Sequence, residues 1–239
     1  MKNPIYSFAF IFQIPLIFLG CGRESESHPF IQVGATDSYL AHPDLSPEWV
    51  KTFARVMGWL SNHCTVTHIG SALGVTAGHC VNALKNLETN QTCEGVSVRW
   101  ISDDMFKLGP SIPCRKILAL QQNGDLDFAI LEFETPALNK IEIARSPRLD
   151  HPIKILSFPH GDLTYSMGCQ SWQDQANLNL VKHDCDTQSG SSGAALLIDN
   201  KIAALHRGSR DGVNVALSVE YINQSLGDLN LSKNQRSND

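Results

Sequence analysis

Apolar positions along this chain come in short runs, and turn-forming Gly, Asn, Asp and Pro residues separate them. Some runs are continuous and others alternate with polar residues, as strands with one or two buried faces do. Short strands bounded by such turn residues are typical of an all-β sandwich or barrel. The predicted strands are 59–60, 69–77, 96–100, 128–133, 153–158, 194–198, 202–205 and 213–219.

Few segments depart from this strand pattern. Residues 47–58 carry apolar side chains at helical spacing and predict one short helix, and residues 221–229 predict a closing helix. Asp199-Asn200 stands between two apolar runs, which indicates a hairpin turn. Residues 21–47 are polar and read as a tether, and residues 232–239 as a disordered tail.

The first twenty residues predict an export signal. Lys2 precedes an uncharged apolar run, 4–19, that is too short and too interrupted by proline for a membrane span. The segment resembles a bacterial lipoprotein signal, in which cleavage before Cys21 leaves a thiol that receives a lipid, although Phe18 departs from the usual leucine. The alternative is ordinary secretion with Cys21 unmodified. We therefore expect a bacterial cell-envelope lipoprotein or a secreted protein that meets membranes only through a lipid on Cys21.

Length and composition limit the number of domains and the classes of partner. The chain has 239 residues, of which 42% are hydrophobic and 18% charged, enough for one large domain or two small ones. Its formal net charge of −5 gives no basic excess of the kind that predicts nucleic-acid binding.

The cysteine count is seven, and setting Cys21 aside leaves three couples that are close in sequence. Six cysteines allow about 15 pairings, which sequence alone does not resolve. No spacing is of the CxxC kind, so we expect no structural zinc site. We also expect no other metal and no cofactor.

Three segments carry candidate chemistry. His79 follows an apolar stretch within Thr76-Ala77-Gly78-His79-Cys80, Asp127 opens an apolar run, and Ser192 lies in Gly190-Ser191-Ser192-Gly193. Taken singly, each has an ordinary interpretation: a core histidine, a solvated aspartate at a strand end, and a glycine-rich turn. Their order along the chain is His, Asp, Ser.

Together these motifs resemble those of the chymotrypsin-like serine endopeptidases. The resemblance covers about residues 59–221 and implies two six-stranded antiparallel β-barrels with the active site between them. It implies His79, Asp127 and Ser192 as the catalytic triad, and the backbone N–H groups of Gly190 and Ser192 as the oxyanion hole. Asp125 is a rival acid, but only Asp127 is followed by the family's Asp-x-Ala-x-Leu pattern.

The same resemblance supports one disulfide strongly, Cys64–Cys80 beside the histidine. Proximity and an even count favour two further pairs, Cys93–Cys114 and Cys169–Cys185. Ser191 replaces the aspartate with which animal members capture a newly cut N-terminus, so that activation mechanism is not implied.

The residues of the candidate substrate pocket give conflicting indications of which substrate side chain it binds. Asp186 stands six residues before Ser192, where trypsin-like enzymes keep an acid that binds a basic substrate side chain. Thr187 and His206 match positions at which the bacterial glutamyl endopeptidase branch binds a substrate carboxylate. We expect cleavage after Glu, and expect Arg207 to reinforce it only if its side chain turns inward, which strand alternation disfavours.

The sequence therefore predicts an all-β peptidase domain at 48–231, with a first barrel at about 55–140, a second at about 150–220 and a C-terminal helix at about 220–229. Residues 1–20 are the predicted signal peptide. We expect an exported, monomeric serine endopeptidase that acts on peptides or proteins. The alternative is a catalytically inactive homologue that binds peptides or a partner protein.

Overall fold

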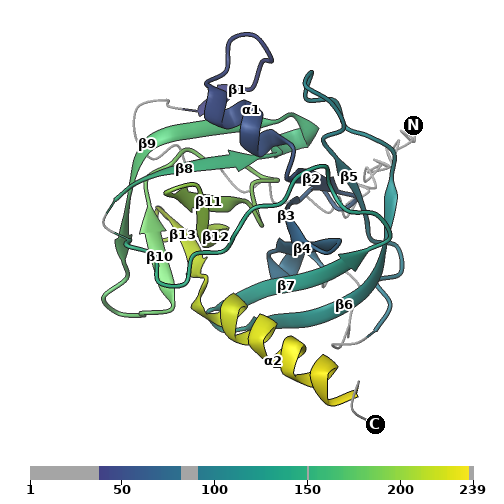
Figure 1. Ribbon diagram of the computed structural model, residues 1–239. Helices are drawn as coiled ribbons and strands as arrows, with labels where there is room; N and C mark the ends of the chain where they lie inside the picture. The colour runs from purple at the N-terminus through teal and green to yellow at the C-terminus, as the bar shows by residue number, and fades with distance from the viewer. Residues whose placement is uncertain (1–37, 82–90, 150, 237–239) are drawn as a thin grey trace, which may run out of the picture.

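Strands dominate the computed structural model, which describes residues 38–81, 91–149 and 151–236 (Figure 1). The predicted signal peptide and Cys21 lie outside these residues, as do most of the predicted tether and the end of the tail. Within them, the three disulfides are Cys64–Cys80, Cys93–Cys114 and Cys169–Cys185, the three pairs that the sequence favours.

The first barrel closes six antiparallel strands in the order β2-β3-β4-β7-β6-β5. Its interior holds Val66, Trp100, Ile117 and Phe133, all buried. The strands are β2 (Met57–Leu60), β3 (Thr65–Gly70), β4 (Leu73–Thr76), β5 (Ser97–Trp100), β6 (Ile112–Asn123) and β7 (Leu126–Phe133).

The second barrel also closes six antiparallel strands, in the order β8-β9-β10-β13-β12-β11, through pairings of β8 with both β9 and β11. Its interior holds Ile155, Val181, Leu196 and Ala216. The strands are β8 (Pro152–Ser157), β9 (Thr164–Gln173), β10 (Leu180–His183), β11 (Ala195–Ile198), β12 (Lys201–Arg210) and β13 (Val213–Ser218). The predicted pair of six-stranded barrels is confirmed.

A third apolar cluster lies where the two barrels meet. It joins Val75 and Phe128 of the first barrel to Leu156 and Leu205 of the second. Burial of apolar surface is the main favourable contribution to folding, so this shared cluster fixes the two barrels against each other. Side chains that reach the cleft from opposite barrels are therefore held in one geometry.

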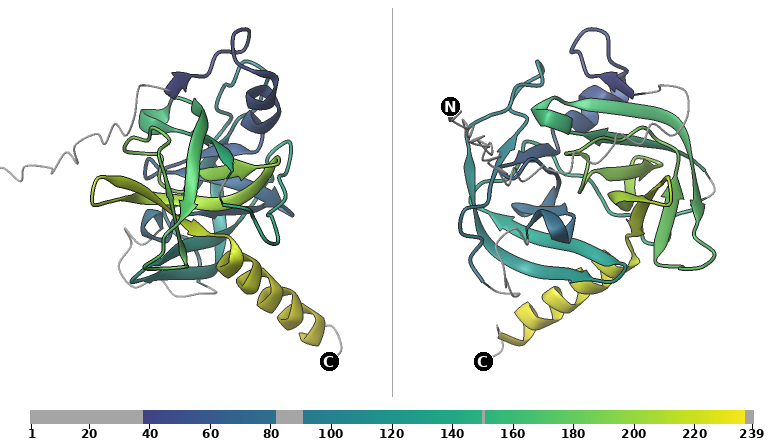
Figure 2. Two further views of the ribbon diagram at one scale, coloured as in Figure 1. Left: turned by 90° about the vertical axis from the view of Figure 1, so that its left-hand side faces the viewer. Right: turned by 180° about the vertical axis from the view of Figure 1, so that it is seen from behind.

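Helices complete the chain at both ends. Helix α1 (Glu48–Ala54) buries Val50 in the cluster between the barrels, and α2 (Glu220–Arg236) follows β13, buries Ile222 there and projects from the body (Figure 2). Because α2 continues to Arg236, residues 232–236 are helical rather than part of a disordered tail. No helix of the described part of the chain is long and apolar enough to cross a membrane.

One part of the predicted tether is folded. Residues Ser38–Leu40 form β1, which pairs with β9, and the Tyr39 ring stacks on Tyr165 at 5.3 Å. Backbone pairing and aromatic packing therefore outweigh the polar, aperiodic sequence that predicts a tether here. The folded domain begins by residue 38.

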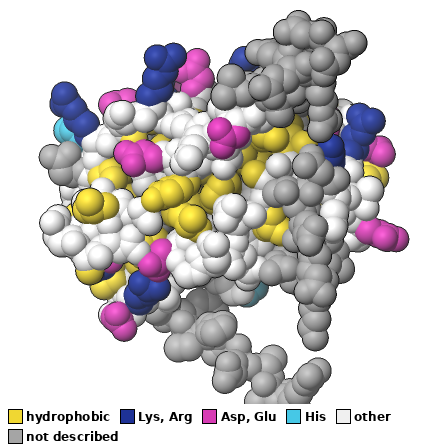
Figure 3. Space-filling view, turned by 90° about the horizontal axis from the view of Figure 1, so that it is seen from below, with side chains coloured by type: hydrophobic (Ala, Val, Ile, Leu, Met, Phe, Trp, Pro, Cys, Tyr) yellow, Lys and Arg dark blue, Asp and Glu magenta, His cyan; other side chains and the backbone are white. Residues whose placement is uncertain are grey.

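The molecular face seen from below carries an apolar strip across its middle, with charged side chains of both signs scattered around it (Figure 3). Among the coloured residues on that face, Lys and Arg side chains do not gather into one continuous patch.

Candidate active site

His79 is held by the single turn that follows β4. This turn is the 3₁₀ helix η1 (Gly78–Cys80), and the disulfide Cys64–Cys80 ties it to the start of β3. The His79 side chain remains 37% exposed, so its ring is accessible from the cleft. A closed loop of this kind fixes the ring position at a strand end.

Asp127 is the second residue of β7 and is only 4% exposed. Its Oδ2 lies 2.7 Å from His79 Nδ1, and its Oδ1 accepts the backbone N–H of His79 at 2.8 Å. Burial raises the pKa of this carboxyl, but the hydrogen bonds and charge of His79 and the charge of Arg207 outweigh that effect and hold the pKa below its usual value. Asp127 is therefore an ionised carboxylate that orients His79.

Gly78 allows this approach. A Cβ at Gly78 would lie 2.3 Å from the Gln121 carbonyl oxygen and 3.0 Å from Asp127 Oδ1. A side chain at position 78 would push η1 away from β6 and from Asp127, which explains the glycine immediately before His79.

The rival acid has other partners. Asp125 lies in the turn between β6 and β7, where Arg210 donates to its Oδ1 at 2.8 Å and the Asn177 side chain donates to its Oδ2. The structure thus brings Asp127, and not Asp125, to His79.

The adjacent serines 191 and 192 lie in different environments. The Ser191 side chain is fully buried, and its Oγ donates to Ser157 Oγ at 3.1 Å. Ser192 is partly exposed and lines the cleft together with His79. Only Ser192 is therefore placed to act on a substrate.

The first barrel holds the serine loop through Thr65, the first residue of β3. Its backbone N–H donates to the Ser192 carbonyl at 2.9 Å, and its Oγ1 donates to the Gly190 carbonyl at 2.8 Å. The same Oγ1 accepts the Phe158 N–H at 2.9 Å. Thr65 therefore fixes the backbone on both sides of Ser191 from the opposite barrel.

The site opens into a cleft of about 510 Å³. Among the described residues that line it are His79, Ser192, Gly190, Thr187 and His206. Asp186 is not part of this lining, and neither is any other acidic residue that the structure describes. The structure therefore brings two of the three predicted specificity residues to the cleft.

Solved structures share this architecture. A Glu endopeptidase in complex with MPD aligns over 81% of this chain and 98% of its own, with a TM-score of 0.64 and 20% identity. The mouse brain protease neuropsin aligns over 73% and 94%, with a TM-score of 0.57 and 14% identity. This is the chymotrypsin-like fold. The fold expected from the sequence motifs is thereby confirmed.

The scabies mite inactivated protease paralogue S-I1 shares the chymotrypsin-like fold as well, with a TM-score of 0.58 and 15% identity over 73% of this chain and 94% of its own. No protein-family model and no curated protein sequence matches the chain. Since inactivated proteases keep this fold, the fold alone does not establish activity.

His206 on β12 forms the buried end of the cleft in this chymotrypsin-like fold. Its Nδ1 lies 3.0 Å from His183 Nε2, which leaves Nε2 as the nitrogen available to the cleft. Burial and the nearby charge of His79 lower the pKa of His206 to about 3, and burial lowers the pKa of His183 as well. Both rings are therefore neutral at neutral pH. His183 gives no motif signal, because a lone histidine in an apolar strand resembles any core residue.

Thr187 plays a less direct part than the sequence predicts. Its hydroxyl donates to Asn214 Oδ1 at 2.9 Å, and Asn214 Nδ2 donates to the Cys185 carbonyl at 2.6 Å. The Thr187 hydroxyl proton is thus engaged with Asn214 and is not directed at a ligand. Thr187 lines the cleft, and His206 Nε2 is the ring nitrogen that lies outside the contact with His183.

A metal site does not fit the residues at this cleft. In the described part of the chain, Cys64, His79 and Cys80 bring potential metal-binding atoms together. The two sulfur atoms are joined in a disulfide, so they offer no thiolate to a metal.

Proposed function

We propose that this protein is a serine endopeptidase. The observation that carries the proposal is the His79–Asp127 pair, joined at 2.7 Å, in which His79 lines the same cleft as the partly exposed Ser192. These are the three groups that acyl transfer needs: a nucleophile, a general base and an acid that orients the base.

In the proposed reaction, Ser192 Oγ attacks the carbonyl carbon of a peptide bond while His79 Nε2 takes the hydroxyl proton. Asp127 accepts the Nδ1–H bond and stabilises the resulting imidazolium. The peptide C–N bond then breaks as His79 donates its proton to the leaving amine. Water hydrolyses the acyl-enzyme by the same route, and the N–H groups of Gly190 and Ser192 stabilise the oxyanion in both steps.

An inactive, peptide-binding homologue is the competing candidate, since inactivated proteases are among the proteins with this fold. Two observations favour catalysis. Both oxygens of the buried Asp127 are engaged with His79, and the loop of Ser192 is held by hydrogen bonds from the other barrel. A binding role alone requires neither arrangement.

Labelling with a fluorophosphonate tests the proposal, because this reagent reacts with an activated serine. We expect the wild-type protein and Ser191→Ala to be labelled, although Ser191→Ala loses a buried hydrogen bond and some stability. We expect Ser192→Ala to remain folded and unlabelled, with peptide hydrolysis reduced by about 10⁶. An unlabelled wild-type protein, or a Ser192→Ala variant that keeps a tenth of the wild-type rate, would contradict the proposal.

We further propose a preference for Glu at the residue before the cleaved bond. The cleft offers the His206 ring and has no acidic residue in its described lining, so a cationic side chain would find no carboxylate partner there. Because His206 is neutral, we propose that it selects by a hydrogen bond rather than by charge: His183 Nε2–H donates to His206 Nδ1, which places the His206 proton on Nε2 for the substrate carboxylate. Asp186, the one signal for basic substrates, is not part of the described lining.

Export to the bacterial envelope also remains a proposal. The three disulfides support it, because disulfides persist in oxidising compartments and are rare in the cytosol. We propose that a lipid on Cys21 anchors a monomeric enzyme, that secretion follows if Cys21 is unmodified, and that its partners are peptide or protein substrates.

A further inference from the structure

Arg207 lies at an irregular point of β12. His206 pairs with Ala216, and Gly208 pairs with Val215, the next residue along β13. Arg207 is thus an extra residue on β12 with no paired residue on β13, which is a β-bulge. Bulges beside active sites re-aim a side chain.

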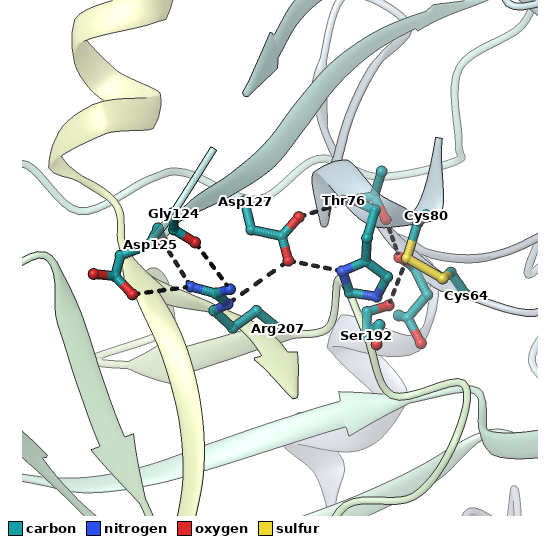
Figure 4. A network of polar contacts seen from close by, with 10 residues as sticks. Cys64, Thr76, Cys80, Gly124, Asp125, Asp127, Ser192 and Arg207 are labelled. Atoms are coloured by element: carbon teal, nitrogen blue, oxygen red, sulfur yellow. Dashed lines mark hydrogen bonds and ion pairs between the residues drawn. A yellow bond between two sulfur atoms is a disulfide. The ribbon is translucent and has the colours of Figure 1, made fainter. Parts of the chain in front are cut away.

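The bulge brings the Arg207 side chain to the first barrel. Its Nη1 donates to the Asp125 carbonyl at 2.9 Å and its Nη2 to the Gly124 carbonyl at 3.4 Å. Its Nε lies 3.7 Å from Asp127 Oδ2. In Figure 4, Asp127 lies between Arg207 and the part of the site that holds Ser192. The Arg207 side chain is only 19% exposed and the Asp127 side chain only 6%, so the contact between these two charges is largely shielded from solvent.

Asp127 Oδ2 therefore faces two basic groups, His79 Nδ1 at 2.7 Å and Arg207 Nε at 3.7 Å. A carboxylate buried to this degree needs compensating partners. His79 supplies two of them, and Arg207 adds a positive charge from the second barrel. The guanidinium is itself held in place by backbone carbonyls, so it is a fixed charge.

We propose that Arg207 is a positioning residue, which orients Asp127 and keeps it ionised so that His79 is held for catalysis. The inference rests on the proposed function. It also assigns a purpose to the β12 bulge, which links the His79–Asp127 pair to the second barrel. From the sequence, Arg207 would reinforce Glu recognition only if its side chain turned inward, and its contacts with the first barrel are not predicted.

Other charged and titratable groups around the pair are few. Asp125 faces Arg207 from the turn between β6 and β7, and Arg210 pairs with Asp125 at 2.8 Å. His206 lies on β12, and His63 lines the cleft from the loop between β2 and β3. Arg210 has no described contact with Asp127, which makes it the matched control for Arg207.

The test is the pH profile of kcat/KM. Its acid limb reports protonation of the His79–Asp127 pair as a unit. Arg207→Gln removes a positive charge beside the pair, so protons bind more readily and the acid limb moves up by about one pH unit. We also expect kcat at the pH optimum to fall about tenfold with KM little changed, since the lost group acts through Asp127.

Arg207→Lys separates charge from geometry. A lysine restores the charge but not the planar fork that binds two carbonyls. We therefore expect its acid limb to stay at the wild-type position while kcat remains reduced. Arg210→Gln is expected to keep both the acid limb and kcat within twofold of wild type.

Two results would overturn the inference: an Arg207→Gln profile that coincides with that of Arg210→Gln, or, if Arg207→Gln fails to fold, an Arg207→Lys variant with wild-type kcat. Fluorophosphonate labelling of the wild type keeps this outcome distinct from failure of the proposed function. If the wild type is labelled and the Arg207 variants behave as wild type, only the role of Arg207 is wrong.

Discussion

The two barrels build their parts of the site in different ways. The first barrel assembles the His79–Asp127 pair from its own residues: a disulfide-linked turn, the start of β7, and a glycine that lets them approach. The second barrel carries Ser192 on a loop whose carbonyl groups are held by Thr65 of the first barrel.

This difference separates the contacts within one barrel from the contacts between the two barrels, and the two kinds of contact contribute differently to activity. The hydrogen bonds of the pair lie within one closed sheet, and the second barrel adds the Arg207 charge beside Asp127. The position of the serine, in contrast, depends on hydrogen bonds between the barrels. We expect changes to the pair to abolish the chemistry. Changes at the docking contacts or in the pocket are expected to reduce rate or selectivity by smaller factors.

The largest effect is expected for Asp127→Asn. The amide keeps the shape but removes the carboxylate that accepts Nδ1–H, so His79 is held in the wrong tautomer and kcat falls about 10⁴-fold. Steady-state kinetics on a peptide substrate measures this. Asp125→Asn, at the rival acid, is expected to lose less than tenfold, because its carboxylate contacts Arg207, Arg210 and Asn177 rather than His79. A larger loss for Asp125→Asn would reverse the assignment.

Sequence predicts the strands that bury continuous apolar runs, such as β7 and β11, because burial on both faces leaves an unbroken signal. It misses β6 and β9, in which polar residues are frequent and many side chains are exposed. The predicted strand 69–77 also misses most of β3 and runs from its end into β4 across Ser71 and Ala72, whose positive φ angles make the turn between the two strands. Neither residue type predicts that backbone conformation.

Within the site, sequence motifs indicate the three reacting side chains but not the residues that hold them. His79, Asp127 and Ser192 stand in recognisable local patterns, whereas Thr65, His183 and Arg207 act through contacts between strands far apart in the chain. The predicted turn at Asp199-Asn200 shows the contrast, because both residues adopt positive φ in a two-residue hairpin. A turn can be predicted because it depends on adjacent residues. Contacts between the two barrels depend on residues far apart in the chain, and the sequence does not predict them.

A smaller, substrate-dependent effect is expected for His206→Ala. Loss of a hydrogen bond to a charged group corresponds to about 1.5–3 kcal/mol, so kcat/KM for substrates with Glu before the cleaved bond falls about 10- to 150-fold. Matched substrates with Leu at that position are expected to change less than threefold. His206→Gln, which keeps a donor, should recover part of the loss. Equal losses on both substrates, or efficient cleavage after Lys or Arg by the wild type, would show that His206 does not select Glu.

The smallest effect is expected at the docking contact itself, in Thr65→Val. Valine keeps the shape and the backbone bond to the Ser192 carbonyl, but leaves the Gly190 carbonyl and the Phe158 N–H without the hydroxyl. We expect the free energy of unfolding to fall by about 1–3 kcal/mol. Because Gly190 supplies part of the proposed oxyanion hole, kcat is expected to fall about tenfold with KM nearly unchanged. Thr65→Ser, which restores the hydroxyl, should recover most of both losses.

Thr67→Val is the matched control, because Thr67 is equally buried on β3 but its hydroxyl faces Met57 Sδ at 3.7 Å. If Thr65→Val and Thr67→Val show the same kcat, the serine loop does not depend on the first barrel, and the two barrels build their parts of the site independently.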